Sequence, residues 1–194
     1  MTRAVLPGQQ AIRDQLREPI YDTVTLVGGE NPSGKRYTFF SDIQGKSKAL
    51  TNLRQPKILE GQVSFLIDAV CIEAQNSSAA NSACLAKIIE HSSIKLRIGE
   101  KDYYEAPMRF LTGGLYVEDA DPAKHYSHTK SMVSSCGLKL RGSDKLSVAP
   151  LQSFEVEWNV DTMSAADAAL ATLAADTNIK FVLKLQGLKR RPVQ

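Results

Sequence analysis

The most constraining feature of this chain is an alternation of apolar and polar residues in four well-separated stretches. Successive side chains of a β-strand point to opposite faces, so every second residue shares a face. The apolar positions are Val63, Phe65, Ile67; Ile94, Leu96, Ile98; Phe154, Val156, Trp158, Val160; and Ile179, Phe181, Leu183, Leu185. Strands with one apolar face bury it against another layer, so the pattern predicts two sheets packed face to face.

Weaker strand signals complete the same architecture. Segments rich in β-branched and aromatic residues, or bounded by Gly and Pro, lie at 21–27, 36–41, 137–141 and 146–151, and a GEKD turn leads into Tyr103 and Tyr104. Apolar spacing at 82–91 and an alanine-rich run at 164–175 predict two helices. The fold class is therefore mostly β, an antiparallel β-sandwich with about eight strands and two short inserted helices. The long separations between strong strands favour jelly-roll-like connections.

The chain divides into a central domain and two short ends. Its 194 residues suit one large β domain, which we place at 21–188. Residues 1–20 form an N-terminal arm, in which 9–17 is either a short helix or a segment that reaches over a neighbour. Residues 189–194 form a basic C-terminal tail.

Composition excludes several classes of protein. Hydrophobic residues make up 43% and charged residues 23% of the chain, and the net charge of +3 does not mark the whole chain as a nucleic-acid binder. The cysteines, Cys71, Cys84 and Cys136, are odd in number and form no CxxC pair, so we expect reduced thiols. No stretch has the apolar length of a membrane span or of a secretory signal, so we expect synthesis in the cytoplasm.

Residues 29–35 match most of a phosphate-binding P-loop, with Gly29, Gly34 and Lys35 at the required spacing. Position 36 is Arg, so the hydroxyl that holds magnesium is missing. The following YTFF favours a strand where the motif needs a helix. We therefore interpret the segment as a β-hairpin loop with a solvated lysine.

The histidines His125 and His128 lie near Asp119, Asp121 and Cys136. A His-x-x-His pair can chelate a metal, and a cysteine near a histidine can be a nucleophile. A long polar loop lacks the fixed geometry that either site needs, so solvated histidines are the preferred interpretation. We predict no catalytic residue, metal or cofactor.

Two sets of residues are candidates for contact with partners. Tyr103 and Tyr104 are candidates for a peptide or glycan surface, or are an ordinary cross-strand aromatic pair. Basic residues at both ends are candidates for contact with a genome or a membrane, or are simply solvated; they are Arg3, Arg13, Arg17, Lys189, Arg190 and Arg191.

Across most of residues 21–188, the spacing of strands resembles the jelly-roll capsid and structural proteins of tailless icosahedral bacterial viruses. The segments that carry this resemblance are SIKLRIGEKDYYEAPMRFLTGG, LQSFEVEWNV and NIKFVLKLQGLKRRPVQ, together with polar arms at both ends. The resemblance implies a virion structural protein, made in the host cytoplasm, that self-assembles into an icosahedral shell. It also implies a homo-oligomer that contacts other virion proteins, and packaged genome or membrane through its termini, with no small-molecule substrate. Such proteins have no catalytic residues, so none are carried over.

Two other functions stay open at this point. One is a lectin-like β-sandwich that binds a glycan or protein through Tyr103, Tyr104 and the 119–134 loop. The other is an enzyme, either a nucleotide hydrolase at 29–35 or a metal hydrolase at His125 and His128. Fold alone does not separate these classes, because sandwiches of this type serve many functions.

Overall fold

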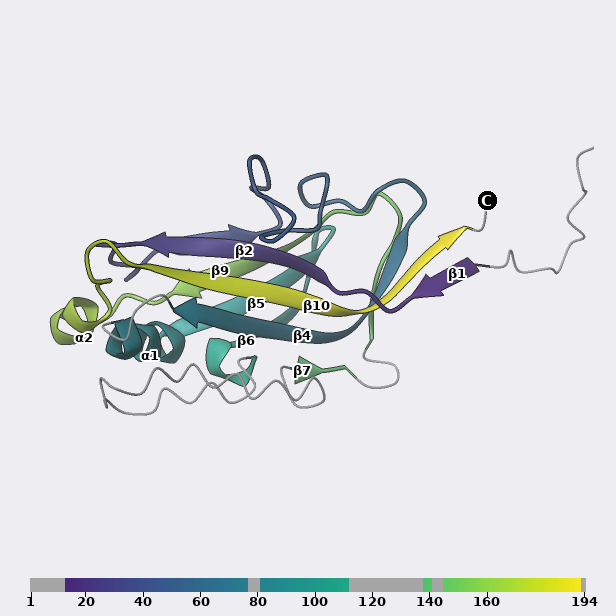
Figure 1. Ribbon diagram of the computed structural model, residues 1–194. Coiled ribbons are helices and arrows are strands. Elements are labelled where there is room, and N and C mark those ends of the chain that lie inside the picture. Colours follow the sequence, from purple (N-terminus) through teal and green to yellow (C-terminus); the bar gives the residue numbers. More distant parts are fainter. Residues whose placement is uncertain (1–12, 77–80, 112–137, 141–144, 193–194) are drawn as a thin grey trace, which may run out of the picture.

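The computed structural model describes residues 13–76, 81–111, 138–140 and 145–192. In these residues the chain forms two antiparallel sheets and two α-helices, which confirms the predicted β-sandwich. The sheets pack face to face, and the two helices lie together at one end of the molecule (Figure 1).

The first sheet is built around the long strand β10. One edge of β10 pairs with β4, and its other edge pairs with β2 and, further along, with β1. The far edge of β4 pairs with β7 and β8. The strands are β1 (Arg13–Leu16), β2 (Ile20–Val27), β4 (Ser64–Asn76), β7 (Leu138–Lys139), β8 (Leu146–Val148) and β10 (Asn178–Pro192).

The second sheet has the order β3-β9-β5-β6. Its strands are β3 (Arg36–Phe39), β5 (Ser92–Ile98), β6 (Lys101–Pro107) and β9 (Phe154–Val160). The chain enters the other sheet after β2, β3, β4, β6, β8 and β9, and stays in one sheet only at β1–β2, β5–β6 and β7–β8. Most neighbours in each sheet are therefore far apart in sequence.

The helices cover one end of the sandwich. Helix α1 (Ser82–Glu90) buries Cys84, Leu85, Ile88 and Ile89 against the core, as its apolar spacing predicts. Helix α2 (Ala165–Leu170) begins where the Ser164 hydroxyl accepts a hydrogen bond from the Asp167 N–H at 3.2 Å. It is shorter than the predicted 164–175, because the Leu173 backbone pairs with Gly29 and Glu30 of the β2–β3 loop.

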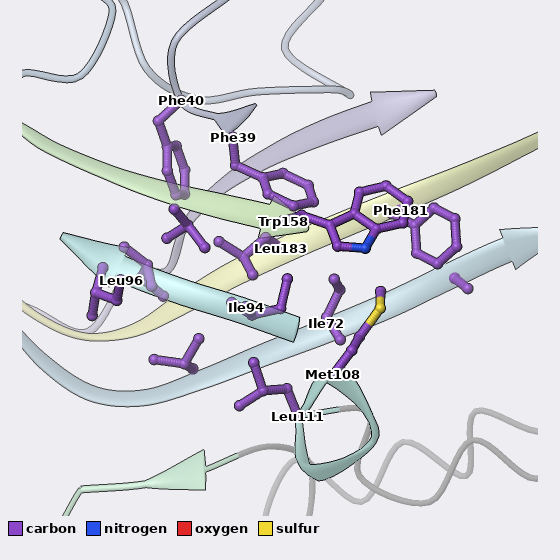
Figure 2. Packing of buried hydrophobic residues seen from close by; sticks show 14 of the residues in the cluster. Phe39, Phe40, Ile72, Ile94, Leu96, Met108, Leu111, Trp158, Phe181 and Leu183 are labelled. Carbon is purple, nitrogen blue, oxygen red and sulfur yellow. The ribbon is translucent and has the colours of Figure 1, made fainter. Parts of the chain in front are cut away.

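The core lies between the two sheets, with Trp158 of β9 at its centre. Trp158 lies beside Phe181 of β10 (Figure 2), with ring centroids 4.5 Å apart. The centroid of Tyr37 on β3 is 4.7 Å from that of Trp158. Trp158 is fully buried, and its indole N–H donates to the Ser92 hydroxyl at 2.9 Å. The alternating apolar residues of the sequence thus meet from both sheets, which is why the sandwich forms.

A buried carboxylate joins β2 to the loop after β3. Asp22 is 0% exposed and accepts hydrogen bonds from the Phe40 N–H at 2.7 Å and from Lys46 Nζ at 2.9 Å. Phe40 has a positive φ of 67°, a conformation that is costly for a bulky residue. The Asp22 carboxylate and the packing of the Phe40 ring against Phe154 hold it there.

Candidate functional site

The two ends of the described chain are paired with each other. β1 forms an antiparallel ladder with the last residues of β10, from Leu16 opposite Lys189 to Arg13 opposite Pro192. Figure 1 shows this ribbon extending beyond the sandwich at the end opposite the helices. Residues 13–16 are therefore a strand and not part of a helix over 9–17. Residues 189–192, which were expected in a separate basic tail, are the end of β10.

β1 and β2 keep the same register on β10. Leu16 faces Lys189 and Ile20 faces Leu185, so residues 17–19 span the same length as the β10 residues opposite them. Side chains therefore continue to alternate between two faces along both strands of the ribbon. One face continues the core side of the first sheet, and the other continues its outer side.

The core-side face of the ribbon carries charges in matched pairs. Asp14 Oδ2 accepts hydrogen bonds from Arg191 at 3.1 Å (Nε) and 2.9 Å (NH2), and the two residues lie directly opposite in the ladder. Lys189 Nζ lies 3.4 Å from Glu18 Oε2. Two of the predicted contact residues, Lys189 and Arg191, are thus compensated by acids of the N-terminal segment.

On the outer face, several cations lie near the carboxylate of Asp68. Asp68 lies between Arg17 NH2 at 3.3 Å and Lys145 Nζ at 3.0 Å. Lys139 is exposed and pairs with Ala69, next to Asp68. Arg190 lies across the ladder from Gln15, and its Nε is buried with no hydrogen-bond partner among the described residues. We call Arg17, Lys139, Lys145 and Arg190 the basic face.

A β-bulge places Asp68 within the basic face. β4 pairs with β10 through Ala69 opposite Gln186 and Ile67 opposite Gly187, so Asp68 is the extra residue. The strands approach closely here: a Cβ on Gly187 would lie 2.0 Å from Leu66 O. Only glycine fits this close approach, so Gly187 is part of the sequence signal for the bulge.

The backbone of β1 presents an open edge. The Tyr21 N–H donates to Asn52 Oδ1 at 2.9 Å and the Tyr21 carbonyl accepts from the Asn52 N–H at 3.3 Å, so odd residues of β2 direct their backbone groups away from β10. The unbroken register gives Gln15 of β1 the same direction. The 48–52 loop covers the β2 edge, whereas no hydrogen bond from the described residues reaches the Gln15 backbone on that side.

The predicted tyrosine pair is split between two faces of β6. Tyr103 is 47% exposed, whereas Tyr104 is partly buried and packs against the core. Desolvation by burial raises the pKa of Tyr104. A bulge between Leu96 and Arg97 leaves Tyr103 without an opposite residue on β5. The two rings therefore do not form one surface.

The P-loop-like segment is a loop between strands. β3 begins at Arg36, where the motif requires a helix, and Lys35 Nζ contacts Glu30 Oε1 at 3.1 Å. The Tyr37 hydroxyl donates to the same carboxylate at 2.8 Å. Burial raises the pKa of Glu30, but hydrogen bonds from Tyr37, Lys35 and the Val27 N–H outweigh it and lower that pKa overall.

Several predicted residues lie outside the described part of the chain. These are Arg3, Asp119, Asp121, His125, His128 and Cys136. The side chain of Arg13 is likewise not described. Within the described ranges, no group of three or more His, Cys, Asp or Glu residues is placed to hold a metal ion. Neither described helix has the length and apolar character of a membrane span.

Sequence reasoning missed three members of the site. Asp68, Lys139 and Lys145 are far from both termini in the sequence, and the antiparallel pairing of β4 with β10, β7 and β8 brings them to Arg17 and Arg190. The signal available in the sequence was Gly187 inside an otherwise regular strand, which is typical of a bulge or close approach.

Comparisons with known proteins supply no relative. No family model matches the chain, and no curated protein or solved structure matches it.

Proposed function

We propose that this chain is a virion structural protein, a capsid subunit that self-assembles into an icosahedral shell. The observation that carries this proposal is the open edge of β1 on a ribbon that extends beyond the sandwich. An unpaired strand edge is a ready template for a strand of another chain, and most proteins cover such edges. Here the neighbouring β2 edge is covered by the 48–52 loop, while no segment in the described part of the chain pairs with β1 on that side.

The order of strands supports a jelly-roll connection for this sandwich. The sheets read β2-β10-β4-β8 and β3-β9-β5-β6, so strands early in the chain pair with strands late in the chain. Double-sheet jelly rolls with two Greek keys have connections of this kind. Such a sandwich is rigid, which suits a subunit that repeats in a lattice.

The lectin-like alternative receives less support from the geometry. It needs Tyr103 and Tyr104 on one surface, and they face opposite sides of β6. Tyr103 alone remains available for contact with a glycan or peptide.

The experiment that tests the proposal compares Gln15→Pro with Gln15→Ala in the full chain. Proline removes the outward Gln15 N–H and blocks strand addition, while the pairing of β1 with β10 uses Asp14 and Leu16. We expect the parent chain and Gln15→Ala to form large particles in light scattering and negative-stain electron microscopy. Gln15→Pro should remain a small species with an unchanged thermal midpoint.

Two results would count against the proposal. The shell proposal would be refuted if the parent chain stayed monomeric at high concentration in both low and high salt. Gln15→Pro particles identical to those of the parent would show that assembly does not use the β1 edge.

A further inference from the structure

The two outer faces of the sandwich differ in charge. On the second sheet, Arg97 contacts Asp102 at 2.7 Å, Glu157 at 3.3 Å and Glu155 at 3.4 Å, and Lys95 contacts Asp102 at 3.3 Å. Arg97 and Lys95 are therefore each compensated by at least one neighbouring acid.

The basic face of the first sheet has the opposite balance. Arg17 and Lys145 share the single carboxylate of Asp68, and no ion pair joins Lys139 or Arg190 to an acid among the described residues. The Arg17 side chain is 75% exposed, and Lys139 is exposed. Arg190 forms no ion pair among the described residues, whereas Arg191 pairs with Asp14, and the Nε of Arg190 is buried without a hydrogen-bond partner.

The alternation of side chains along the β1–β10 ribbon places its acids and two of its cations on opposite faces. The acids of the N-terminal segment, Asp14 and Glu18, occupy even positions and meet Arg191 and Lys189 on the core side. Arg17 occupies an odd position, and Arg190 lies opposite odd-numbered Gln15, so both are on the outer side. Among the described residues of the ribbon, the acids therefore lie on one face and the cations Arg17 and Arg190 on the other.

We propose that the basic face binds the phosphate groups of nucleic acid, so that this side of the subunit faces the packaged genome. The proposal deepens the shell function and rests on it for the identity of the nucleic acid. Lysine and arginine side chains on one face bind phosphates by releasing condensed counterions, and such binding is independent of base sequence.

Nucleic acid fits this surface better than a lipid membrane does. Membrane-binding surfaces combine cations with apolar or aromatic side chains that enter the headgroup region. By register, the polar residues Gln15, Ser64 and Ser147 lie among the cations, and the two leucines of the same face, Leu66 and Leu188, are only partly exposed. The exposed Leu16 lies on the other face of the ribbon, opposite Lys189.

The salt dependence sets the size of the expected effect. For single strands, the logarithm of the affinity falls by about 0.7 per phosphate contact for each tenfold rise in salt. Loss of two contacts should therefore weaken binding roughly 25-fold at about 0.1 M salt, and should reduce the slope by about 1.4.

The test is fluorescence anisotropy with a labelled single-stranded oligonucleotide of about 30 nucleotides over a salt series. The test variant Arg17→Gln/Lys139→Gln neutralises two exposed cations of the basic face. The control Arg36→Gln/Lys101→Gln removes the same charge from two exposed positions of the second sheet. Circular dichroism confirms folding, and Lys139→Gln alone is a second variant that disturbs no ion pair among the described residues. Vesicles of phosphatidylcholine with phosphatidylserine form a parallel arm.

We expect a large loss of oligonucleotide binding in the test variant and little change in the control. Equal losses in both would overturn the proposal, because net charge alone would then explain binding. No binding by the parent, or binding to vesicles only, would also overturn it. Light scattering on the same samples separates the two proposals: particles without oligonucleotide binding would refute only the basic face, and binding by a permanent monomer would refute only the shell.

Discussion

Gly187→Ala is the sharpest perturbation of the contact between β4 and β10. A Cβ at this position would lie 2.0 Å from Leu66 O, 2.9 Å from Leu66 C and 3.0 Å from Phe65 Cζ. Non-bonded heavy atoms pack at roughly 3.5 Å, so one of the two strands must move by more than about 1 Å. The obstacle is mainly backbone, and it cannot rotate away as a side chain would.

The expected cost follows from what must move. Overpacking costs about 1–3 kcal/mol, and the shift weakens about two ladder hydrogen bonds at ~1 kcal/mol each. Alanine restricts the unfolded chain and returns about 0.4–1 kcal/mol. The free energy of unfolding should therefore fall by roughly 2–4 kcal/mol, and at about 2–4 °C per kcal/mol the thermal midpoint should fall by roughly 10 °C.

Urea unfolding followed by the fluorescence of Trp158, the single tryptophan, measures this change. Gly45→Ala is the matched control, because Gly45 has a φ of 75° and nothing within 4 Å of its Cβ position. Its cost should be limited to the left-handed conformation, about 1–2 kcal/mol. A Gly187→Ala loss no greater than that of Gly45→Ala would refute the close approach of β4 and β10.

Three further predictions concern buried or hydrogen-bonded groups. Asp22→Ala leaves the Lys46 ammonium and the Phe40 N–H without their acceptor, and should lower the free energy of unfolding by about 3–5 kcal/mol in urea titrations. A loss below about 1 kcal/mol would contradict the buried pair. The folded-state pKa of Glu30 lies below its ordinary 4.5, so its carboxylate stabilises the fold above that pH and this stability is lost as the pH falls through the lower folded value. Glu30→Gln should flatten the stability profile between neutral and acidic pH, and an unchanged profile would exclude this role. Burial raises the pKa of the Cys84 thiol to about 11, so mass spectrometry should find it alkylated by iodoacetamide only after unfolding.

Alternation in the sequence predicted the sandwich because burial acts on every second residue of a strand. All four apolar residues of 154–160 are buried in β9, and the same holds for the four in β10. Alanine content did not predict where α2 ends. Helix propensity is a weak influence beside tertiary contacts, and the hydrogen bonds of Leu173 with the β2–β3 loop end the helix early.

The pairing of the termini was beyond local patterns. Asp14 and Arg191 are 177 residues apart in sequence, and neither end alternates clearly enough to show that it is a strand. The basic residues were therefore grouped by their closeness to the chain ends. In the structure, the face on which each of them lies depends on the parity of its position, which becomes defined only when the partner strand and its register are known.

Charge explains why this register is preferred in the ribbon. The observed ladder places Asp14 opposite Arg191 and Gln15 opposite Arg190, with no like charges facing each other. A slip of one residue in one direction would set Arg13 against Arg191, and a slip in the other would set Arg17 against Lys189. Like charges directly opposite in a ladder are destabilising, so either slip gains a repulsion, and the second slip also moves Asp14 from Arg191 to a position opposite Pro192. The register that avoids both also separates the acids from the basic face, and the open edge and the basic face therefore depend on the same pairing.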